Sequence, residues 1–333
     1  MRTTFLLLSY NQEAYAAEAV KAALAQDGEP ITILISDDAS TDRTFEIIQA
    51  AVAGYSGHHR VELNRNPHNL GLAAHINACM RKITTEYVIA AAADDISMPQ
   101  RAIRVCEAFN HTNALLLHSR FEEIDKTGMA NPGSFPSKAA FFLRDTSALR
   151  ATEQMGLYVG ATGAWHRSLF DIYGEIDDGC YEDLILGFRA ALESRIAFID
   201  EVLVRYRTGV GISAMDRTSG RKETWRSDRM TGLARKQSVF SQRLRDASRS
   251  SHQDRTAISS KLEHAIRINC LRMQCCEQGA LTFLGRNMAR PHVALLIILS
   301  ERRKRKRAKK RARVTCHGIF PPSATRVLPK EGT

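Results

Sequence analysis

Adjacent acidic residues follow two apolar segments of the chain, at points where strands are expected to end. Asp37 and Asp38 come directly after a β-branched run, and Asp94 and Asp95 come directly after a run of alanines. Two neighbouring carboxylates at the end of a buried strand repel each other and lose hydration, a cost that a bound ligand offsets. Carboxylate oxygens are hard ligands suited to Mg²⁺ or Mn²⁺ that also binds phosphate oxygens. The pattern therefore predicts a metal and phosphate site.

Simpler explanations exist for both pairs. Ser40, Thr41 or Asp42 can cap a helix that begins near Arg43, and the acids at 94 and 95 can belong to a surface turn. Capping needs only one of these side chains, however, and it leaves the pair at 37 and 38 unexplained.

A third acidic pair, Glu182 and Asp183, opens an amphipathic segment that runs to Leu192. A carboxylate at a helix N-terminus is stabilised in its ionised form, which suits a general base and equally suits a helix cap. If the three acidic pairs meet in one cleft, they describe a metal and diphosphate site that faces a catalytic base.

Other phosphate and hydrolase chemistries lack their signatures in this sequence. There is no G-x-x-x-x-G-K-[ST] loop and no G-x-S-x-G motif, and Gly209-x-Gly211 follows a strand without a matching helix. The seven cysteines form no C-x-x-C pair or zinc-like cluster, so we expect reduced thiols that serve packing.

An alternation of strands and helices must position these acids. Apolar β-type runs predict strands, and apolar residues at helical spacing predict helices between them. The expected strands are 4–9, 31–36, 61–64, 87–92 and 115–118, and the expected helices are 13–26, 42–53, 72–83 and 99–110. This order predicts an α/β fold with an open, mainly parallel sheet flanked by helices, in which ligands bind beyond the carboxyl ends of the strands.

After the first 120 residues, the pattern of residue types changes at two points along the chain. A mixed, glycine-containing region at 121–206 is expected to form the second wall of the cleft and to add strands 196–199 and 202–206 at the sheet edge. Three- and four-residue spacing of apolar residues then predicts a helical hairpin packed on the main domain. We therefore expect a domain at 1–213, a helical subdomain at 214–290 that offers an oligomer surface, and a partly disordered tail at 291–333.

The net charge of +11 on 333 residues is a property of that tail. Ten cations lie between Arg302 and Arg313 with no acid among them, so the remaining chain is nearly neutral. Beside the apolar residues 293–299, this run predicts a segment that lies on an anionic membrane, with nucleic-acid contact or a merely solvated tail as alternatives. No apolar run reaches the roughly 20 residues of a membrane span, and the N-terminal run is too short for a signal peptide, so a cytoplasmic protein is expected.

In their order and spacing, five pieces of the sequence resemble the family 2 glycosyltransferases, inverting enzymes with the GT-A fold. The resemblance covers about residues 3 to 213 and rests on residues 9–13, 37–44, 69–71, 94–101 and 182–190. It implies a nucleotide-diphosphate sugar donor, with a UDP-sugar expected, lying across the strand ends. The base and ribose would lie among Ser9, Asn11, Asp37 and Asp38, with Asn69 and Gly71 lining the nucleoside pocket.

The resemblance also implies roles for the two later acidic pairs. Asp94 and Asp95 match the D-x-D region, so one carboxylate would contact the ribose or sugar and the other, by preference Asp95, would hold Mn²⁺ or Mg²⁺. Asp183, with Glu182 as the alternative, would take the proton of the acceptor hydroxyl in a single displacement with inversion. Trp165 and Arg167 are candidates for the acceptor pocket, or else a core aromatic residue and a surface charge.

The sequence departs from the family pattern at three places. Ala92 stands where many members have an aspartate, Ile76 where an arginine is common, and Arg207 with its neighbours where a histidine often completes the metal site. The expected setting, from the resemblance alone, is bacterial polysaccharide or lipopolysaccharide synthesis by a hexosyltransferase at the inner face of the cell membrane, with a glycan or lipid-linked acceptor. A catalytically idle sugar-nucleotide-binding protein and a nucleotidyltransferase are the rival functions.

Overall fold

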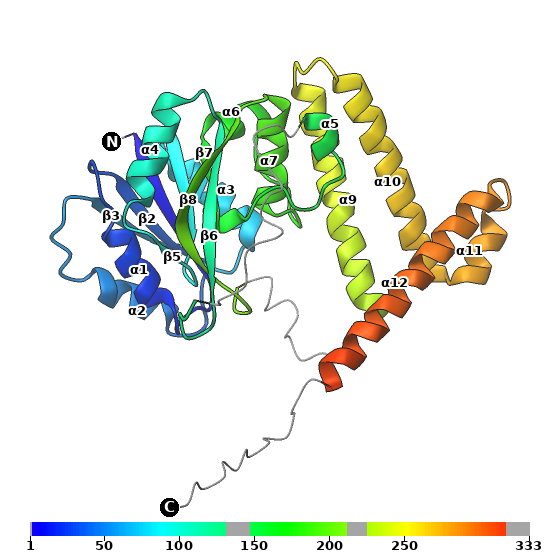
Figure 1. The fold of residues 1–333 in the computed structure, drawn as a ribbon, viewed down its shortest axis with the longest axis horizontal. Coiled ribbons are helices and arrows are strands. Elements are labelled where there is room, and N and C mark those ends of the chain that lie inside the picture. Colours follow the sequence, from blue (N-terminus) through cyan, green and yellow to red (C-terminus); the bar gives the residue numbers. More distant parts are fainter. Residues whose placement is uncertain (1, 131–146, 212–224, 318–333) are drawn as a thin grey trace, which may run out of the picture. The chain divides into compact units, whose positions relative to one another are not determined.

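The computed structural model describes residues 2–130, 147–211 and 225–317, with side chains to residue 308. Within these residues, eight strands form one mixed sheet in the order β3-β2-β1-β4-β7-β6-β8-β5 (Figure 1). The strands are β1 (Thr3–Ser9), β2 (Thr32–Asp37), β3 (Arg60–Arg65), β4 (Tyr87–Ala92), β5 (Ile96–Ser97), β6 (Leu116–Ile124), β7 (Ala164–His166) and β8 (Ile196–Arg207).

Strands β3, β2, β1 and β4 are parallel neighbours, as the alternation of strands and helices predicts. The register pairs Ser9 with Asp37 and Leu8 with Ala92, so these strands end at one edge of the sheet. Strand β7 then runs antiparallel between β4 and β6. The carboxyl ends of β1, β2 and β4 therefore bring the first two acidic pairs to the same side of the molecule.

Helices cover both faces of the sheet because alternate strand residues point to opposite sides. Phe5 and Leu7 pack toward α1 (Ala16–Leu24), α2 (Thr44–Val52) and α4 (Arg101–His111). Leu6 packs with the other core, to which α3 (Leu72–Lys82), α5 (Ala148–Ala151), α6 (Ser168–Tyr173) and α7 (Glu182–Leu192) contribute. Residues 184–192 of α7 are all buried.

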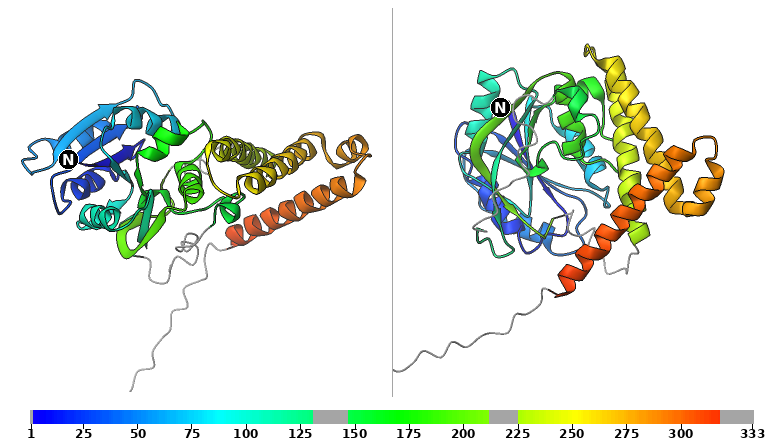
Figure 2. Two further views of the ribbon diagram at one scale, coloured as in Figure 1. Left: turned by 90° about the horizontal axis from the view of Figure 1, so that it is seen from above. Right: turned by 45° about the vertical axis from the view of Figure 1, so that its right-hand side comes forward.

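The chain divides into two compact units, residues 1–221 with 234–267 and residues 222–233 with 268–333. Helices α9 (Trp225–Arg249) and α10 (Arg255–Gln278) contribute to both, whereas α11 (Ala280–Arg286) and α12 (Pro291–His317) belong to the second. In the second unit α11 and α12 lie side by side (Figure 2). The buried Phe283 of α11 packs there with Ala294 and Ile298 of α12. The buried Glu301 of α12 accepts hydrogen bonds from Arg229 at 2.6 and 2.8 Å.

The structure differs from the predictions in two elements. The expected strands 196–199 and 202–206 form the single strand β8, whose register against β6 shifts near Ser119 and Arg120, and β5 lies outside it at the sheet edge. Residues 291–317, expected to belong to a partly disordered tail, form the helix α12.

Other expectations for the C-terminal region are not decided. The predicted domain boundaries at 213 and 290 stay predictions, and residues 214–224 and 318–333 lie outside the described residues. Among the described helices, none combines the length and apolar character that a bilayer span needs.

Candidate active site

A cavity of about 630 Å³ lies at the carboxyl ends of β1 and β4, within the first compact unit. Side chains from all three acidic pairs line it: Asp38, Asp94, Asp95, Glu182 and Asp183. Strand ends supply the first three, and the N-terminus of α7 supplies the last two. The structure therefore brings together acids that lie more than a hundred residues apart in the sequence.

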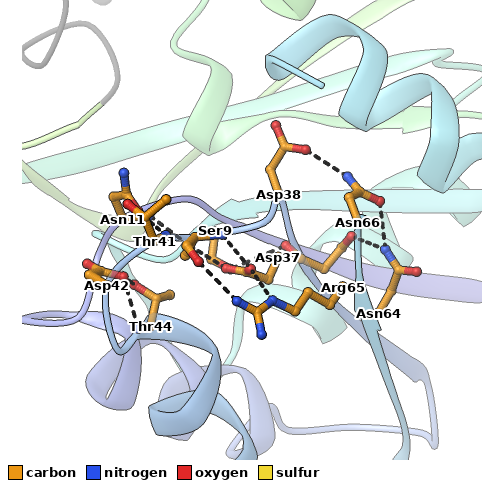
Figure 3. Close-up of polar contacts among 12 residues, drawn as sticks. Ser9, Asn11, Asp37, Asp38, Thr41, Asp42, Thr44, Asn64, Arg65 and Asn66 are labelled. Carbon is orange, nitrogen blue, oxygen red and sulfur yellow. Dashed lines mark hydrogen bonds and ion pairs between the residues drawn. The ribbon is translucent and has the colours of Figure 1, made fainter. Parts of the chain in front are cut away.

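Asp38 anchors one end of the cavity. Its Oδ1 accepts a hydrogen bond from Nδ2 of Asn66 at 2.8 Å (Figure 3). The same oxygen accepts from the amide of Leu70 at 3.0 Å, and Oδ2 accepts from the amide of Gly71 at 2.9 Å. Gly71 begins α3 with φ of 79°, a conformation that glycine adopts without strain. Asp38 thus fixes the loop that carries Asn69 and Gly71 to the cavity wall.

The neighbouring Asp37 does not line the cavity. Its carboxylate accepts from the hydroxyl of Ser9 at 3.1 Å and the amide of Ser40 at 2.9 Å, and it lies 3.7 Å from the Nε of Arg65 (Figure 3). Asn11 also lies outside the lining and accepts from the Thr41 amide at 2.8 Å. Of the residues expected around the base and ribose, Ser9 and Asp38 face the cavity, whereas Asp37 and Asn11 hold its wall together.

Asp94 and Asp95 form the middle of the cavity and are only 5% and 6% exposed. Oδ1 of Asp95 accepts from the amide of Arg207 at 2.7 Å, and Nε of Arg207 donates to the carbonyl of Asp94 at 2.9 Å. Burial raises the pKa of Asp94, and burial with the neighbouring charge of Asp94 raises the pKa of Asp95 well above its ordinary value. Both carboxylates therefore lack a full counter-charge in the protein alone.

Two buried arginines, Arg207 and Arg101, act on this pair. The sequence resemblance aligned Arg207 with a histidine position of the metal site, but it gave Arg101 no role. Arg101 donates to the hydroxyl of Ser97 at 2.9 Å and to the carbonyl of Ala90 at 2.6 Å. Burial lowers the pKa of Arg101 to about 9, and the charge of Asp95 opposes that effect. Arg101 stands inside the 94–101 motif, so its position was visible in the sequence, but burial of its guanidinium beneath the acids was not.

The acids at 94 and 95 are compatible with a divalent cation. Among the described residues, no cluster of three or more His, Cys, Asp or Glu side chains could hold a metal alone. Magnesium-type sites commonly use one or two carboxylates and complete the shell with substrate phosphates and water. Two desolvated carboxylates with raised pKa values fit such a site, provided that a diphosphate supplies further oxygens.

Glu182 and Asp183 occupy the first turn of α7 and face the cavity from its other wall. Burial, followed by the charge of Asp183, raises the pKa of Glu182 to about 8. Burial raises the pKa of Asp183 to about 6, and the Leu184 amide and the Arg243 charge oppose this rise. Oδ1 of Asp183 is buried and accepts no hydrogen bond from the described residues. Burial thus raises both pKa values, that of Glu182 further, and one carboxylate oxygen of Asp183 faces no hydrogen-bond donor of the described residues.

The close packing around Glu182 and Asp183 was not predicted from the sequence. A Cβ added at Gly160 of η1 (Gly160–Thr162) would meet Oε1 of Glu182, so a larger residue there would require the Glu182 carboxylate to move. Tyr158 is buried and lines the same wall, and its hydroxyl has no partner within the described part of the chain. Neither residue stands in a motif that could have signalled this role.

The acceptor candidates Trp165 and Arg167 do not line the cavity. Trp165 is fully buried in β7, because that strand lies inside the sheet between β4 and β6, and its ring packs near Phe170. Arg167 donates to the carbonyl of Ile83 at 2.6 Å. Trp165 therefore agrees with the alternative of a core aromatic residue, and Arg167, whose side chain is 33% exposed, with that of a surface charge. We assign neither residue to the acceptor pocket.

Comparisons with known proteins bear on this site. "Putative glycosyltransferase EpsE" of Bacillus subtilis is 37% identical over 92 residues, 28% of this chain and 32% of that protein. "Uncharacterized glycosyltransferase alr2836" of Nostoc sp. is 24% identical over 215 residues, 60% of this chain and 64% of that protein. The match thus spans about a third of the first relative and under two thirds of the second.

Solved structures share the fold at low sequence identity. S. aureus TarS 1–349 in complex with UDP-GlcNAc superposes with a TM-score of 0.54 at 17% identity, covering 94% of this chain and 92% of that chain. The mannosyltransferase PcManGT from Pyrobaculum calidifontis, in complex with GDP-Man and Mn²⁺, gives a TM-score of 0.54 at 15% identity, covering 90% and 79%. The predicted GT-A fold is confirmed by these neighbours.

The family comparison covers the strands and helices that build the cavity floor. The model described as "Glycosyl transferase family 2" matches residues 4–173, which include β1, β2, β4 and the acidic pairs at 37–38 and 94–95. The chain belongs to glycosyl transferase family 2.

Proposed function

We propose that this protein transfers a sugar from a nucleotide-diphosphate sugar to a hydroxyl of a glycan or lipid-linked acceptor, with inversion at the anomeric carbon. The observation that carries the proposal is the single cavity lined by Asp38, by Asp94 and Asp95, and by Glu182 and Asp183. The solved neighbours in complex with UDP-GlcNAc, or with GDP-Man and Mn²⁺, support a nucleotide-sugar donor, for which a UDP-sugar remains our first choice.

The donor would lie along the strand ends. Its nucleoside would contact the end formed by Ser9, Asp38, Asn69 and Gly71. Asp95, together with Asp94, would hold Mn²⁺ or Mg²⁺, and this ion neutralises the charge of the diphosphate leaving group when bound. The described residues of this chain then position the donor and exclude water from its anomeric carbon.

Asp183 is the proposed general base. The acceptor hydroxyl gives its proton to the free carboxylate oxygen of Asp183, and its oxygen forms a bond to the anomeric carbon. The bond from that carbon to the diphosphate oxygen breaks at the same time, and the nucleoside diphosphate leaves with the electron pair. Attack from the face opposite the leaving group inverts the anomeric centre.

The transfer rate is expected to fall as pH drops through about 6. The pKa of Asp183 is raised to about 6, so the ionised base is present above this pH and is lost below it. A rate measured at saturating donor and acceptor should decrease roughly tenfold for each pH unit below 5. A profile flat from pH 7 to pH 4.5, in buffers that leave the fold intact, would contradict this assignment.

A donor screen tests the proposed activity as a whole. Thermal unfolding is measured with uridine, guanosine and thymidine diphosphate sugars, with and without Mn²⁺, and each stabilising donor is then assayed for hydrolysis or transfer. Transfer or slow sugar-nucleotide hydrolysis supports the glycosyltransferase. Tight binding without turnover favours an idle binding protein, and release of pyrophosphate favours a nucleotidyltransferase.

We further propose that the enzyme works at the inner, anionic face of the cell membrane, and that α12 provides the contact. The exposed side of α12 begins with Leu295 and Leu299 and continues, at helical spacing, to Arg302 and Lys306. The leucines are 50% and 39% exposed, while residues 294, 297, 298 and 301 form the buried side. Leucines followed by cations on one exposed side suit an interfacial helix on anionic lipid. A homo-oligomer through the same leucines is the alternative.

Charge reversal on α12 should weaken vesicle binding. The triple change Arg302→Glu, Arg303→Glu and Lys306→Glu should lower affinity for phosphatidylglycerol vesicles by at least ~10²-fold, because each cation contributes about 1 kcal/mol. Sedimentation with vesicles measures this. Reversal of the exposed Lys21, Arg43 and Lys126 provides the control. Equal loss in both triples would reject α12 as the contact, and a changed oligomeric state in Leu295→Glu would favour self-association.

A further inference from the structure

Arg243 of α9 lies beneath the base-bearing helix, in the same compact unit as the cavity. It is fully buried, and its Nε and Nη2 donate to the carbonyl of Leu184 at 3.1 and 2.7 Å. Its Nη1 donates to the carbonyls of Ala151 at 3.0 Å, Thr152 at 2.9 Å and Gln154 at 2.8 Å. One guanidinium therefore joins the first turn of α7 to the segment that follows α5.

The charge of Arg243 has no carboxylate in direct contact among the described ion pairs. Asp246, one turn further along α9, is held by Arg189, whose Nε lies 2.8 Å from its Oδ2. Burial lowers the pKa of Arg243 to about 10, and the charge of Asp183 is the strongest influence in the opposite direction. A buried guanidinium bonded only to carbonyls is costly unless a nearby negative charge balances it, and Asp183 supplies that charge.

The positive charge of Arg243 affects Asp183 because the other described side chains around Asp183 carry no positive charge. Glu182 on α7, Tyr158 before η1 and Tyr206 on β8 face the same space, and none of these side chains carries a positive charge. The Leu184 amide and then the charge of Arg243 oppose the rise in the pKa of Asp183 that burial causes, whereas the pKa of Glu182 rises to about 8. The positive charge near Asp183 favours that acid as the base, which is also the choice that the sequence resemblance implies.

We propose that Arg243 is a positioning residue for the transfer reaction, fixing the first turn of α7 against the cavity and holding a buried positive charge near Asp183. This inference rests on the proposed function, in which Asp183 accepts the proton. Arg243 stands seventy residues beyond the end of the family match at residue 173, so this role would belong to a residue outside the matched segment.

The test compares Arg243→Gln with Arg189→Gln. Both changes remove a fully buried arginine that ties α9 to the main domain, but only Arg243 balances Asp183. In Arg243→Gln the acid limb of the pH–rate profile should move up by about one unit, as expected for loss of a nearby opposite charge. Below pH 5 the kcat should fall ~10-fold relative to wild type, because a rise of about one pKa unit leaves a tenth as much ionised base there. At pH 7 the kcat should fall only about twofold, while KM for the donor should stay nearly unchanged. In Arg189→Gln the acid limb should stay in place.

The outcomes separate this inference from the proposed activity. Wild-type protein that transfers no sugar refutes the proposed function, whereas active wild type with an unmoved acid limb in folded Arg243→Gln overturns the role of Arg243. Equal shifts in both variants also overturn it. If Arg243→Gln does not fold, Arg243→Lys decides: it keeps the charge but fewer hydrogen bonds, so kcat should fall with the limb unmoved, and an unchanged kcat overturns the proposal.

Discussion

The change Asp183→Asn is expected to reduce kcat by ~10²–10⁴-fold, the usual contribution of a general base. Asparagine has nearly the same shape, and the carboxylate oxygen it replaces accepts no hydrogen bond within the described residues, so no hydrogen bond is lost there. The change does remove the negative charge that balances Arg243, so thermal unfolding is measured beside the kinetics. Donor binding should persist, because Asp183 belongs to the wall opposite Asp38 and the strand ends. Single-turnover kinetics with calorimetric titration of the donor separate the two effects.

Two substitutions near Asp183 serve as comparisons for the Asp183→Asn variant. Glu182→Gln replaces a side chain whose pKa of about 8 already keeps it mainly protonated at pH 7, so the rate should fall far less than in Asp183→Asn. Asp178→Asn alters an exposed acid outside the cavity and should leave turnover unchanged. If Glu182→Gln is instead the inactive variant, the two acids exchange roles, and unaltered turnover in Asp183→Asn removes that residue from the mechanism.

The change Asp95→Asn should abolish transfer by a different route, through weaker donor binding. Loss of one of two charged oxygen ligands is expected to lower metal-dependent donor affinity on the order of 10²-fold. The empty protein should not be destabilised. Because burial raises the pKa of Asp95 well above its unfolded value, its ionised form opposes folding at neutral pH, and the neutral amide removes this penalty.

Thermal unfolding provides both readouts for this variant. Asp95→Asn alone should unfold at the same or a higher temperature than wild type, and the stabilisation by donor with Mn²⁺ should largely disappear. Asp27→Asn, an exposed acid away from the cavity, is the matched control. Retained donor stabilisation in Asp95→Asn would place the cation elsewhere.

Much of the first half of the fold follows from local pattern. The apolar runs that end in Asp37 and Asp94 predicted β2 and β4 to within a residue or two, because strands buried on both faces tolerate few polar side chains. Parallel pairing then puts their ends at one edge, which is why the sequence placed Asp38, Asp94 and Asp95 near each other correctly.

Side-chain direction and long-range contact could not be predicted in this way. Nothing in the sequence of Asp37 and Asp38 says that one binds the loop and the other faces the cavity, since the turn after β2 decides it. In the sequence, Arg243 is one of many charged residues in a predicted helix. Its burial becomes visible only in the structure, where α9 packs against α7. The helix α12 was mistaken for a tail because its cation-rich half lacks apolar periodicity.

The complete enclosure of α7 after its first turn limits how substrate preference can be redesigned. Every residue from 184 to 192 packs against the interior, so a size change there deforms the scaffold before it reaches the bound sugar. Libraries that seek a new acceptor should therefore spare this segment and diversify Val159 and Ala161, which border the cavity and are only partly buried, while keeping Gly160 and the positive-φ Gly209.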